Sequence, residues 1–123
     1  MRIRRVGIVG AGTMGSAIAA LVASAGVPVV LLDLPGERER LEVVKRGLRR
    51  ALEARPPAFL DPDCARLITL GTTEDDLAHL ASCDWVIEAI VEQPEPKRAL
   101  FARLEGVLGP NTIVSSNTSG IPI

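Results

Sequence analysis

The sequence predicts an α/β fold in which helices cover both faces of a doubly wound parallel sheet. Apolar runs typical of buried strands alternate along the chain with segments of helical periodicity, and most links between them are short. Hydrophobic residues make up 47% of the 123 residues but aromatic residues only 2%, so the core must be aliphatic, as in buried parallel sheets. The length fits one domain.

The first strand is expected at residues 3–9, an apolar run with high β-propensity that stops at a glycine cluster. From Thr13 the apolar spacing becomes helical, and Gly26 marks the end of this helix. Its buried face is expected to consist of Met14, Ile18, Leu21 or Val22, and Ala25. A glycine turn therefore joins the first strand to the first helix.

The second strand is expected at residues 27–32, directly before Asp33. An amphipathic helix follows at 37–54 and ends at a pair of prolines, because proline removes a backbone donor. Its apolar positions are Leu41, Val44, Leu48 and Leu52. Residues 35–66 are more than one crossover needs, so we expect an extra helical excursion after strand two.

The rest of the chain continues the alternation of strands and helices. Further strands are expected at 67–70, 85–91 and 112–114. Further helices are expected from residue 61, at 75–80, and after Pro94 and Pro96, the last with Leu100, Leu104 and Leu108 on one face. The last strand leads into a polar run that begins at Ser115.

The glycine turn fits the pattern Gly-x-Gly-x-x-Gly of Rossmann-type dinucleotide sites. Gly10 permits a tight turn, Gly12 lets a pyrophosphate approach the backbone, and Gly15 lets the helix press on the strand. The free N–H groups of the helix start then hold the anion. The candidate cofactor-binding residues of this turn are Gly10, Ala11, Gly12, Thr13, Met14 and Gly15.

Asp33 is the candidate ribose-binding acid, since it closes strand two at nearly the offset expected for that role. Its carboxylate can accept hydrogen bonds from ribose hydroxyls and would repel a 2′-phosphate, so NAD is expected rather than NADP. The alternative for Asp33 is an ordinary helix cap or turn residue.

Composition excludes several other classes of function. Fourteen basic and fifteen acidic side chains leave no excess charge for nucleic acid. Cys64 and Cys83 lack metal or redox spacing, and the single histidine, His79, is expected on a solvated helix, so we expect no metal site. We find no signal peptide and no apolar run of membrane-spanning length, and therefore expect a cytoplasmic protein without membrane contact.

Residues 6–20, 84–101 and 113–121 closely resemble the NAD-binding domain of the 3-hydroxyacyl-CoA dehydrogenases. The similarity spans nearly the whole chain, and the Ser-Asn-Thr-Ser run after the last strand is more specific than the glycine pattern. The segment 55–62 resembles the long bacterial members that continue into an enoyl-CoA hydratase-like region.

This resemblance implies further site residues. Glu92 and Lys97 match the family's NAD-contacting pair, and Ser119, with Asn117 beside it, matches the serine that touches the nicotinamide end and the substrate oxygen. From the residues alone, Glu92 reads as a loop acid, Lys97 as a solvated helix residue, and the serine run as a turn or cap.

The resemblance also implies oxidation of a 3-hydroxyacyl-CoA to the 3-oxoacyl-CoA by hydride transfer to NAD, as in fatty-acid β-oxidation. We expect residues 1–123 to be a dinucleotide-binding domain that stops before the family's catalytic histidine segment and its helical C-terminal domain, which supports a homodimer. Alone, the chain should bind NAD and be inactive. Alternatives are another β-hydroxyacid dehydrogenase or a non-catalytic NAD-sensing module.

An arginine-rich stretch lies in the expected excursion. In the family this excursion contacts CoA, but the aligned positions here are Ala51 and Ala58, so CoA contact stays open. Because glutamates are interspersed, we favour a salt-bridged solvent face over a phosphate patch. The basic residues are Arg38, Arg40, Lys45, Arg46, Arg49, Arg50 and Arg55.

Overall fold

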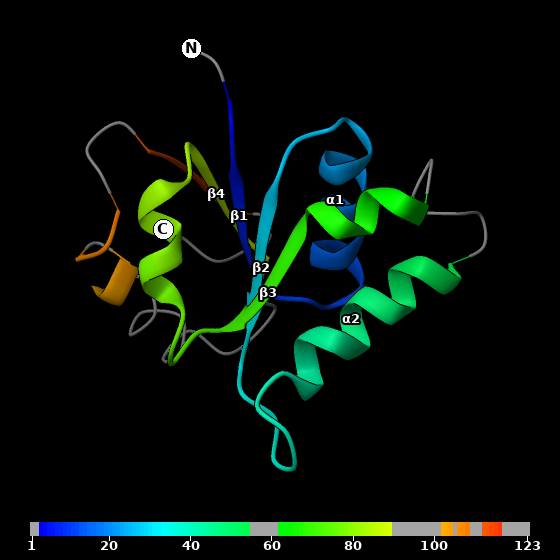
Figure 1. The fold of residues 1–123 in the computed structure, drawn as a ribbon. Helices are drawn as coiled ribbons and strands as arrows, with labels where there is room; N and C mark the ends of the chain where they lie inside the picture. Colours follow the sequence, from blue (N-terminus) through cyan, green and yellow to red (C-terminus); the bar gives the residue numbers. More distant parts are fainter. Residues whose placement is uncertain (1–2, 55–61, 90–101, 105, 109–111, 117–123) are drawn as a thin grey trace.

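The computed structural model describes residues 3–54, 62–89, 102–104, 106–108 and 112–116. These residues contain a five-stranded parallel sheet with the strand order β3-β2-β1-β4-β5 (Figure 1). The strands are β1 (Val6–Val9), β2 (Val29–Asp33), β3 (Ile68–Thr72), β4 (Trp85–Glu88) and β5 (Ile113–Ser116). The order runs outward in both directions from β1, which confirms the doubly wound, Rossmann-type fold.

Helices cover both faces of this sheet. The α-helices α1 (Thr13–Ser24) and α2 (Glu42–Glu53) and the 3₁₀ helix η1 (Pro62–Leu67) pack on one face. The 3₁₀ helix η2 (Leu77–Ser82) and the helical residues 102–104 pack on the other, as Figure 1 shows. The helical excursion expected after the second strand is therefore confirmed as α2 and η1.

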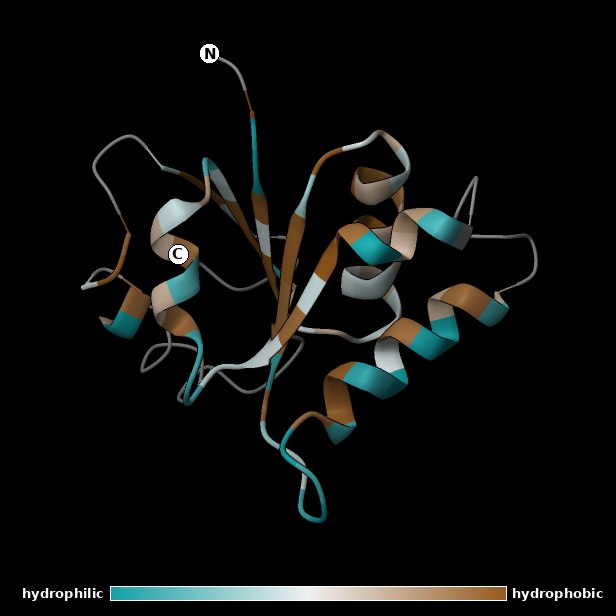
Figure 2. Ribbon diagram, viewed as in Figure 1, coloured by the Kyte–Doolittle hydropathy of each residue, from teal (hydrophilic) through white to brown (hydrophobic). Residues whose placement is uncertain are grey.

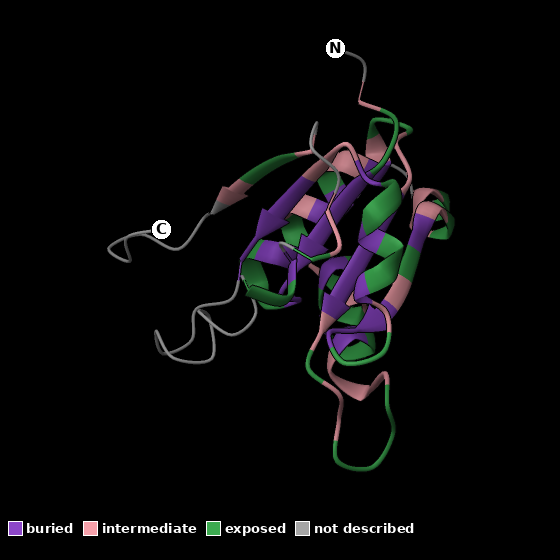
Figure 3. Cartoon of the chain, turned by 90° about the vertical axis from the view of Figure 1, so that its left-hand side faces the viewer, coloured by how far each residue is buried: buried purple, intermediate pink, exposed green. Residues whose placement is uncertain are grey.

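The core is aliphatic and lies on both sides of the strands. Val6 and Ile8 join the cluster beneath α1 and α2, whereas Val9 joins the cluster beneath η2, because successive strand residues point to opposite faces. The strands β1, β2 and β4 are almost entirely buried (Figure 3) and strongly hydrophobic (Figure 2), whereas Ile113 and Val114 of β5 are exposed. This double burial explains why β2 appears in the sequence as a continuous apolar run.

Several element bounds differ from those expected. The helix expected from residue 37 begins at Glu42, because the Gly36 N–H donates to the Arg40 carbonyl (3.2 Å) and closes a turn ahead of the helix. The strand expected at 112–114 extends to Ser116, which pairs with Glu88 of β4. Residues 90 and 91, expected in the fourth strand, lie outside the described residues.

The buried face of α1 was predicted wrongly in part. Met14 is 54% exposed, Leu21 is 66% exposed, and Ala25 is exposed, although Ile18 and Val22 pack on the core as expected. The helix lies close to the sheet, and its fully buried positions all hold small residues. These are Gly15, Ser16, Ala19, Ala20 and Ala23.

Candidate cofactor-binding site

The site is built on the turn between β1 and α1. Gly10 follows β1 with a φ of +114°, a backbone conformation that residues with a side chain rarely adopt. Its N–H donates to the Leu32 carbonyl of β2 at 2.7 Å. The chain therefore reverses sharply at the carboxyl end of β1 while it stays tied to the neighbouring strand.

Gly12 and Gly15 occupy opposite steric environments. A Cβ on Gly15 would lie 1.8 Å from the Gly10 carbonyl oxygen, so the first turn of α1 rests directly on the glycine turn. A Cβ on Gly12 would meet nothing within 4 Å. The backbone at Gly12 therefore faces open space at the start of α1, where no side chain caps the helix.

Asp33 is held against the same turn. The Ala11 N–H donates to Asp33 Oδ2 at 2.6 Å, and the Leu34 N–H donates to Asp33 Oδ1 at 2.6 Å. Two short hydrogen bonds fix the carboxylate at the end of β2, beside the turn that approaches from β1. These two backbone N–H groups therefore fix the orientation of the Asp33 carboxylate.

Two residues that shape the turn were not expected from the sequence. Ser16 is buried in α1 and donates through Oγ to the Ala11 carbonyl at 2.8 Å. Gly47 of α2 packs on the same carbonyl, and a Cβ there would lie 2.2 Å from the Ala11 oxygen. A signal was present for Gly47, because a glycine inside a helix costs about 1 kcal/mol relative to alanine and so needs a packing reason.

A buried acid also went unrecognised at the end of β4. Glu88 has no exposed surface and pairs in register with Val9 of β1 and Ser116 of β5. It therefore lies at the carboxyl end of β4, beside the carboxyl end of β1 where the glycine turn begins. In the sequence, Glu88 belongs to the segment 84–101 that resembles the family, and no separate role was expected for it.

The arginine-rich face of α2 differs from the expected ladder of salt bridges. Lys45 Nζ pairs with Glu39 at 2.7 Å, but within the described ranges no ion pair involves Arg46, Arg49 or Arg50. Figure 2 shows hydrophilic and hydrophobic residues alternating along this helix. The expectation of a salt-bridged face therefore fails for these three arginines.

The other chemically reactive side chains lie away from the glycine turn. His79 is exposed on η2, as expected, and Cys83 is buried, whereas Cys64 is only partly buried. No group of three or more His, Cys, Asp or Glu residues in the described part of the chain could hold a metal ion. None of the helices described here is long and apolar enough to cross a bilayer.

Four of the expected site residues, Glu92, Lys97, Asn117 and Ser119, lie outside the described residues. They follow the two strands β4 and β5, which end at Glu88 and Ser116. The structure thus brings together the glycine turn and Asp33 from separate parts of the sequence.

A glycine turn open at its second glycine, with an acid fixed at the end of the next strand, defines a dinucleotide-binding α/β domain. Comparison with known families makes the assignment specific. The model of the family described as "3-hydroxyacyl-CoA dehydrogenase, NAD binding domain" matches residues 5–123, so the chain belongs to this family. The resemblance seen in the sequence is confirmed, and NAD is the cofactor of the matching domain.

Individual relatives agree with the family match. A Deinococcus radiodurans protein named "Probable 3-hydroxyacyl-CoA dehydrogenase" is 50% identical over 125 residues, which cover all of this chain and 36% of the relative. A 3-hydroxybutyryl-CoA dehydrogenase from Mycobacterium tuberculosis is 42% identical over 126 residues, covering 98% of this chain and 43% of the relative.

Solved structures show the same relationship. The crystal structure of 3-hydroxybutyryl-CoA dehydrogenase from Escherichia coli K12 superposes with a TM-score of 0.76 and 33% identity, covering all of this chain and 26% of that one. The chain thus spans less than half the length of these relatives.

Proposed function

We propose that the chain binds NAD as the cofactor-holding part of an oxidoreductase that interconverts 3-hydroxyacyl-CoA and 3-oxoacyl-CoA. The observation that carries this proposal is the position of Asp33, whose carboxylate is hydrogen-bonded to the Ala11 amide next to the open backbone of Gly12. The names of the relatives, several of which are 3-hydroxyacyl-CoA or 3-hydroxybutyryl-CoA dehydrogenases, supply the substrate class.

The described residues fit the cofactor. The space in front of Gly12 admits a pyrophosphate to the start of α1, where the N–H groups of the first helical turn and the helix dipole favour an anion. Each Asp33 oxygen accepts one short backbone hydrogen bond and keeps a lone pair for a ribose hydroxyl. Asp33 also disfavours a 2′-phosphate at that hydroxyl, which accounts for NAD rather than NADP.

NAD, when bound, supplies the hydride acceptor for the alcohol substrate. The chain's own residues bind and orient it: the glycine turn holds the pyrophosphate and Asp33 the adenosine ribose. By resemblance, Glu92 and Lys97 add contacts to NAD. Ser119, with Asn117 beside it, is suited to hydrogen-bond the substrate oxygen, because a hydroxyl can donate to a ketone or accept from an alcohol.

Turnover also needs a base to take the hydroxyl proton as the hydride leaves. The chain has one histidine, His79, which is exposed on the crossover helix η2 between β3 and β4, away from the glycine turn. The proposal is therefore that the 123 residues bind NAD without turning over substrate, and that catalysis needs the histidine segment and helical domain found in the family.

The remaining parts of the proposal concern the whole protein. We place it in the cytoplasm, acting on 3-hydroxyacyl-CoA without nucleic-acid partners, as a homodimer formed through the helical domain of the family. Light scattering on the longer reading frame tests the dimer, and a monomer at micromolar concentration would exclude it.

Calorimetric titration of the chain with NAD tests cofactor binding. The variant Asp33→Asn should raise the Kd for NAD about tenfold, since hydrogen bonds to a charged group contribute about 1.5–3 kcal/mol. Asp84→Asn is the matched control, because Asp84 likewise accepts from backbone N–H groups, those of Arg4 (2.7 Å) and Arg5 (3.2 Å), but before β4 rather than at the glycine turn. An equal loss of NAD affinity in both variants would show that Asp33 is not part of the binding site.

An assay with acetoacetyl-CoA and NADH tests the reaction. The longer reading frame should oxidise NADH, whereas the 123-residue chain should not. Activity in the short chain would refute the assignment of the base to a missing segment. An inactive long frame that still binds NAD would instead favour the sensing module.

A further inference from the structure

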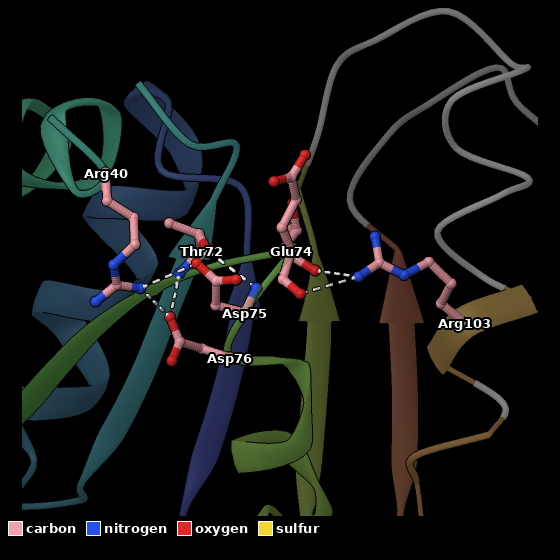
Figure 4. A network of polar contacts seen from close by, with 7 residues as sticks. Arg40, Thr72, Glu74, Asp75, Asp76 and Arg103 are labelled. Atoms are coloured by element: carbon pink, nitrogen blue, oxygen red, sulfur yellow. Dashed lines mark hydrogen bonds and ion pairs between the residues drawn. The ribbon is translucent and has the colours of Figure 1, made fainter. Parts of the chain in front are cut away.

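Arg40 lies in the turn between β2 and α2. Its Nη1 donates to Asp76 Oδ2 at 2.7 Å and lies 3.7 Å from Asp75 Oδ2 (Figure 4). Both acids belong to the turn that follows β3. The guanidinium is thus held toward β3 by two carboxylates.

The acidic turn is itself anchored. The Thr72 N–H donates to Asp76 Oδ2 at 2.8 Å, and the Asp75 N–H donates to Thr72 Oγ1 at 3.1 Å. On the other side, Arg103 Nη2 donates to the Thr73 carbonyl at 2.7 Å (Figure 4). The hydrogen bond from Thr72 and the contacts with Arg40 hold the pKa of Asp76 below its ordinary value, so the carboxylate is charged at neutral pH.

The same turn is joined directly to Asp33. Thr72 is the register partner of Asp33, and the Thr73 N–H donates to the Asp33 carbonyl at 2.9 Å. The Gly36 N–H donates to the Arg40 carbonyl, so the chain from Asp33 to Arg40 folds back at the strand end. Arg40 is therefore a cation placed beside the end of β2, where NADP-binding domains use an arginine to hold the 2′-phosphate.

We propose that Asp75 and Asp76 are specificity-determining residues that enforce the choice of NAD by holding Arg40 away from the ribose 2′ position. The pair acts in two ways: it occupies the cation that would neutralise a 2′-phosphate, and it adds negative charge on that side of the ribose. This discrimination works by weakening the binding of NADP and not by strengthening the binding of NAD. The proposal rests on the proposed function, in which Asp33 binds the ribose.

The test measures Kd for NAD and for NADP by calorimetry on the 123-residue chain. Asp76→Asn removes the charge but keeps an amide oxygen to accept from the Thr72 N–H. It should strengthen NADP binding about fivefold, the upper range for release of one exposed ion pair, and leave NAD within about twofold. Asp75→Asn, which makes no backbone bond through its carboxylate among the described residues, should act in the same direction with a smaller effect.

Two further variants separate release of Arg40 from a general change of charge. Adding Arg40→Gln to Asp76→Asn should abolish the gain for NADP. Glu39→Gln removes one negative charge from the turn that contains Arg40 and frees Lys45 instead of Arg40. It should therefore leave the ratio of the Kd values for NAD and NADP unchanged.

Unchanged NADP binding in both aspartate variants, a gain that survives loss of Arg40, or an equal gain in Glu39→Gln would each overturn the inference. Those results would leave the proposed function intact as long as the wild-type chain binds NAD. Failure of the wild type to bind NAD would instead defeat the proposed function itself.

Discussion

Gly12 and Gly15 provide a sharp test, because substitution by alanine should weaken NAD binding at Gly12 but lower the stability of the fold at Gly15. In Gly12→Ala the new Cβ meets nothing within 4 Å, and the backbone (φ −71°, ψ −166°) suits any residue. The gain from a less flexible unfolded chain, about 0.4–1 kcal/mol, roughly offsets the poorer helix cap, which costs about 1 kcal/mol. The free energy of unfolding should therefore stay within about 1 kcal/mol of the wild type.

NAD binding should nevertheless fail in this variant. The methyl group fills the space through which the pyrophosphate approaches the backbone, so the Kd should rise at least about tenfold, or about 1.4 kcal/mol. Thermal unfolding and calorimetric titration measure the two quantities on the same sample.

Gly15→Ala is the matched control. Its Cβ would lie 1.8 Å from the Gly10 oxygen and 2.9 Å from the Gly10 carbon, both backbone atoms that cannot rotate away. Overpacking of this kind costs about 3 kcal/mol, which lowers the Tm of a domain of this size by roughly 10 °C. Wild-type NAD affinity in Gly12→Ala would refute the placement of the pyrophosphate, and an unchanged Tm in Gly15→Ala would refute the close packing of α1.

Further outcomes follow from other described contacts. Gly47→Ala should lower the free energy of unfolding by about 2 kcal/mol, because its Cβ would lie 2.2 Å from the Ala11 oxygen; Gly106→Ala, whose nearest contact is 3.6 Å, should be neutral in the same denaturant titration. The pKa of Asp76 is lower in the folded chain than its ordinary value of 3.8, so the charged carboxylate stabilises the fold at pH values above 3.8. The difference in Tm between the wild type and Asp76→Asn should therefore shrink as the pH falls through 3.8 and below. A difference in Tm that stays constant down to pH 2 would contradict this sign. Burial raises the pKa of the Cys83 thiol to about 11, so at pH 8 a thiol reagent should label Cys64 while Cys83 reacts only on unfolding; rapid labelling of a Cys64→Ser variant would show that Cys83 is accessible.

The sequence predicted the sheet well because its central strands, β1, β2 and β4, are buried on both faces. Val29 to Leu32 form an unbroken apolar run, and such a run has few other stable places in a small α/β domain. The glycine turn and Asp33 were also recognisable, since each has a local steric or positional requirement. The link between Asp33 and Ala11 is a contact across 22 residues and could be inferred only from the fold.

The errors have two physical causes, tertiary packing and a local turn. Met14 has the right helical spacing for the core, yet it is exposed, and the fully buried positions of α1 all hold small residues. Residues 37–41 have helical composition, but a turn that closes onto Arg40 delays α2 to Glu42. The first effect depends on partners distant in the chain, whereas the second is a local turn that replaces the expected first turn of the helix.

The contact between Gly47 and the Ala11 carbonyl has an evolutionary consequence. The helix α2 packs against the glycine turn, so substitutions at its contact position should be coupled to substitutions in that turn. Chimeras that exchange the excursion that contains α2 between family members should retain their fold only when positions 11, 16 and 47 are transplanted as a set. Lineages that carry a bulkier residue at position 47 should show compensating change at the other two.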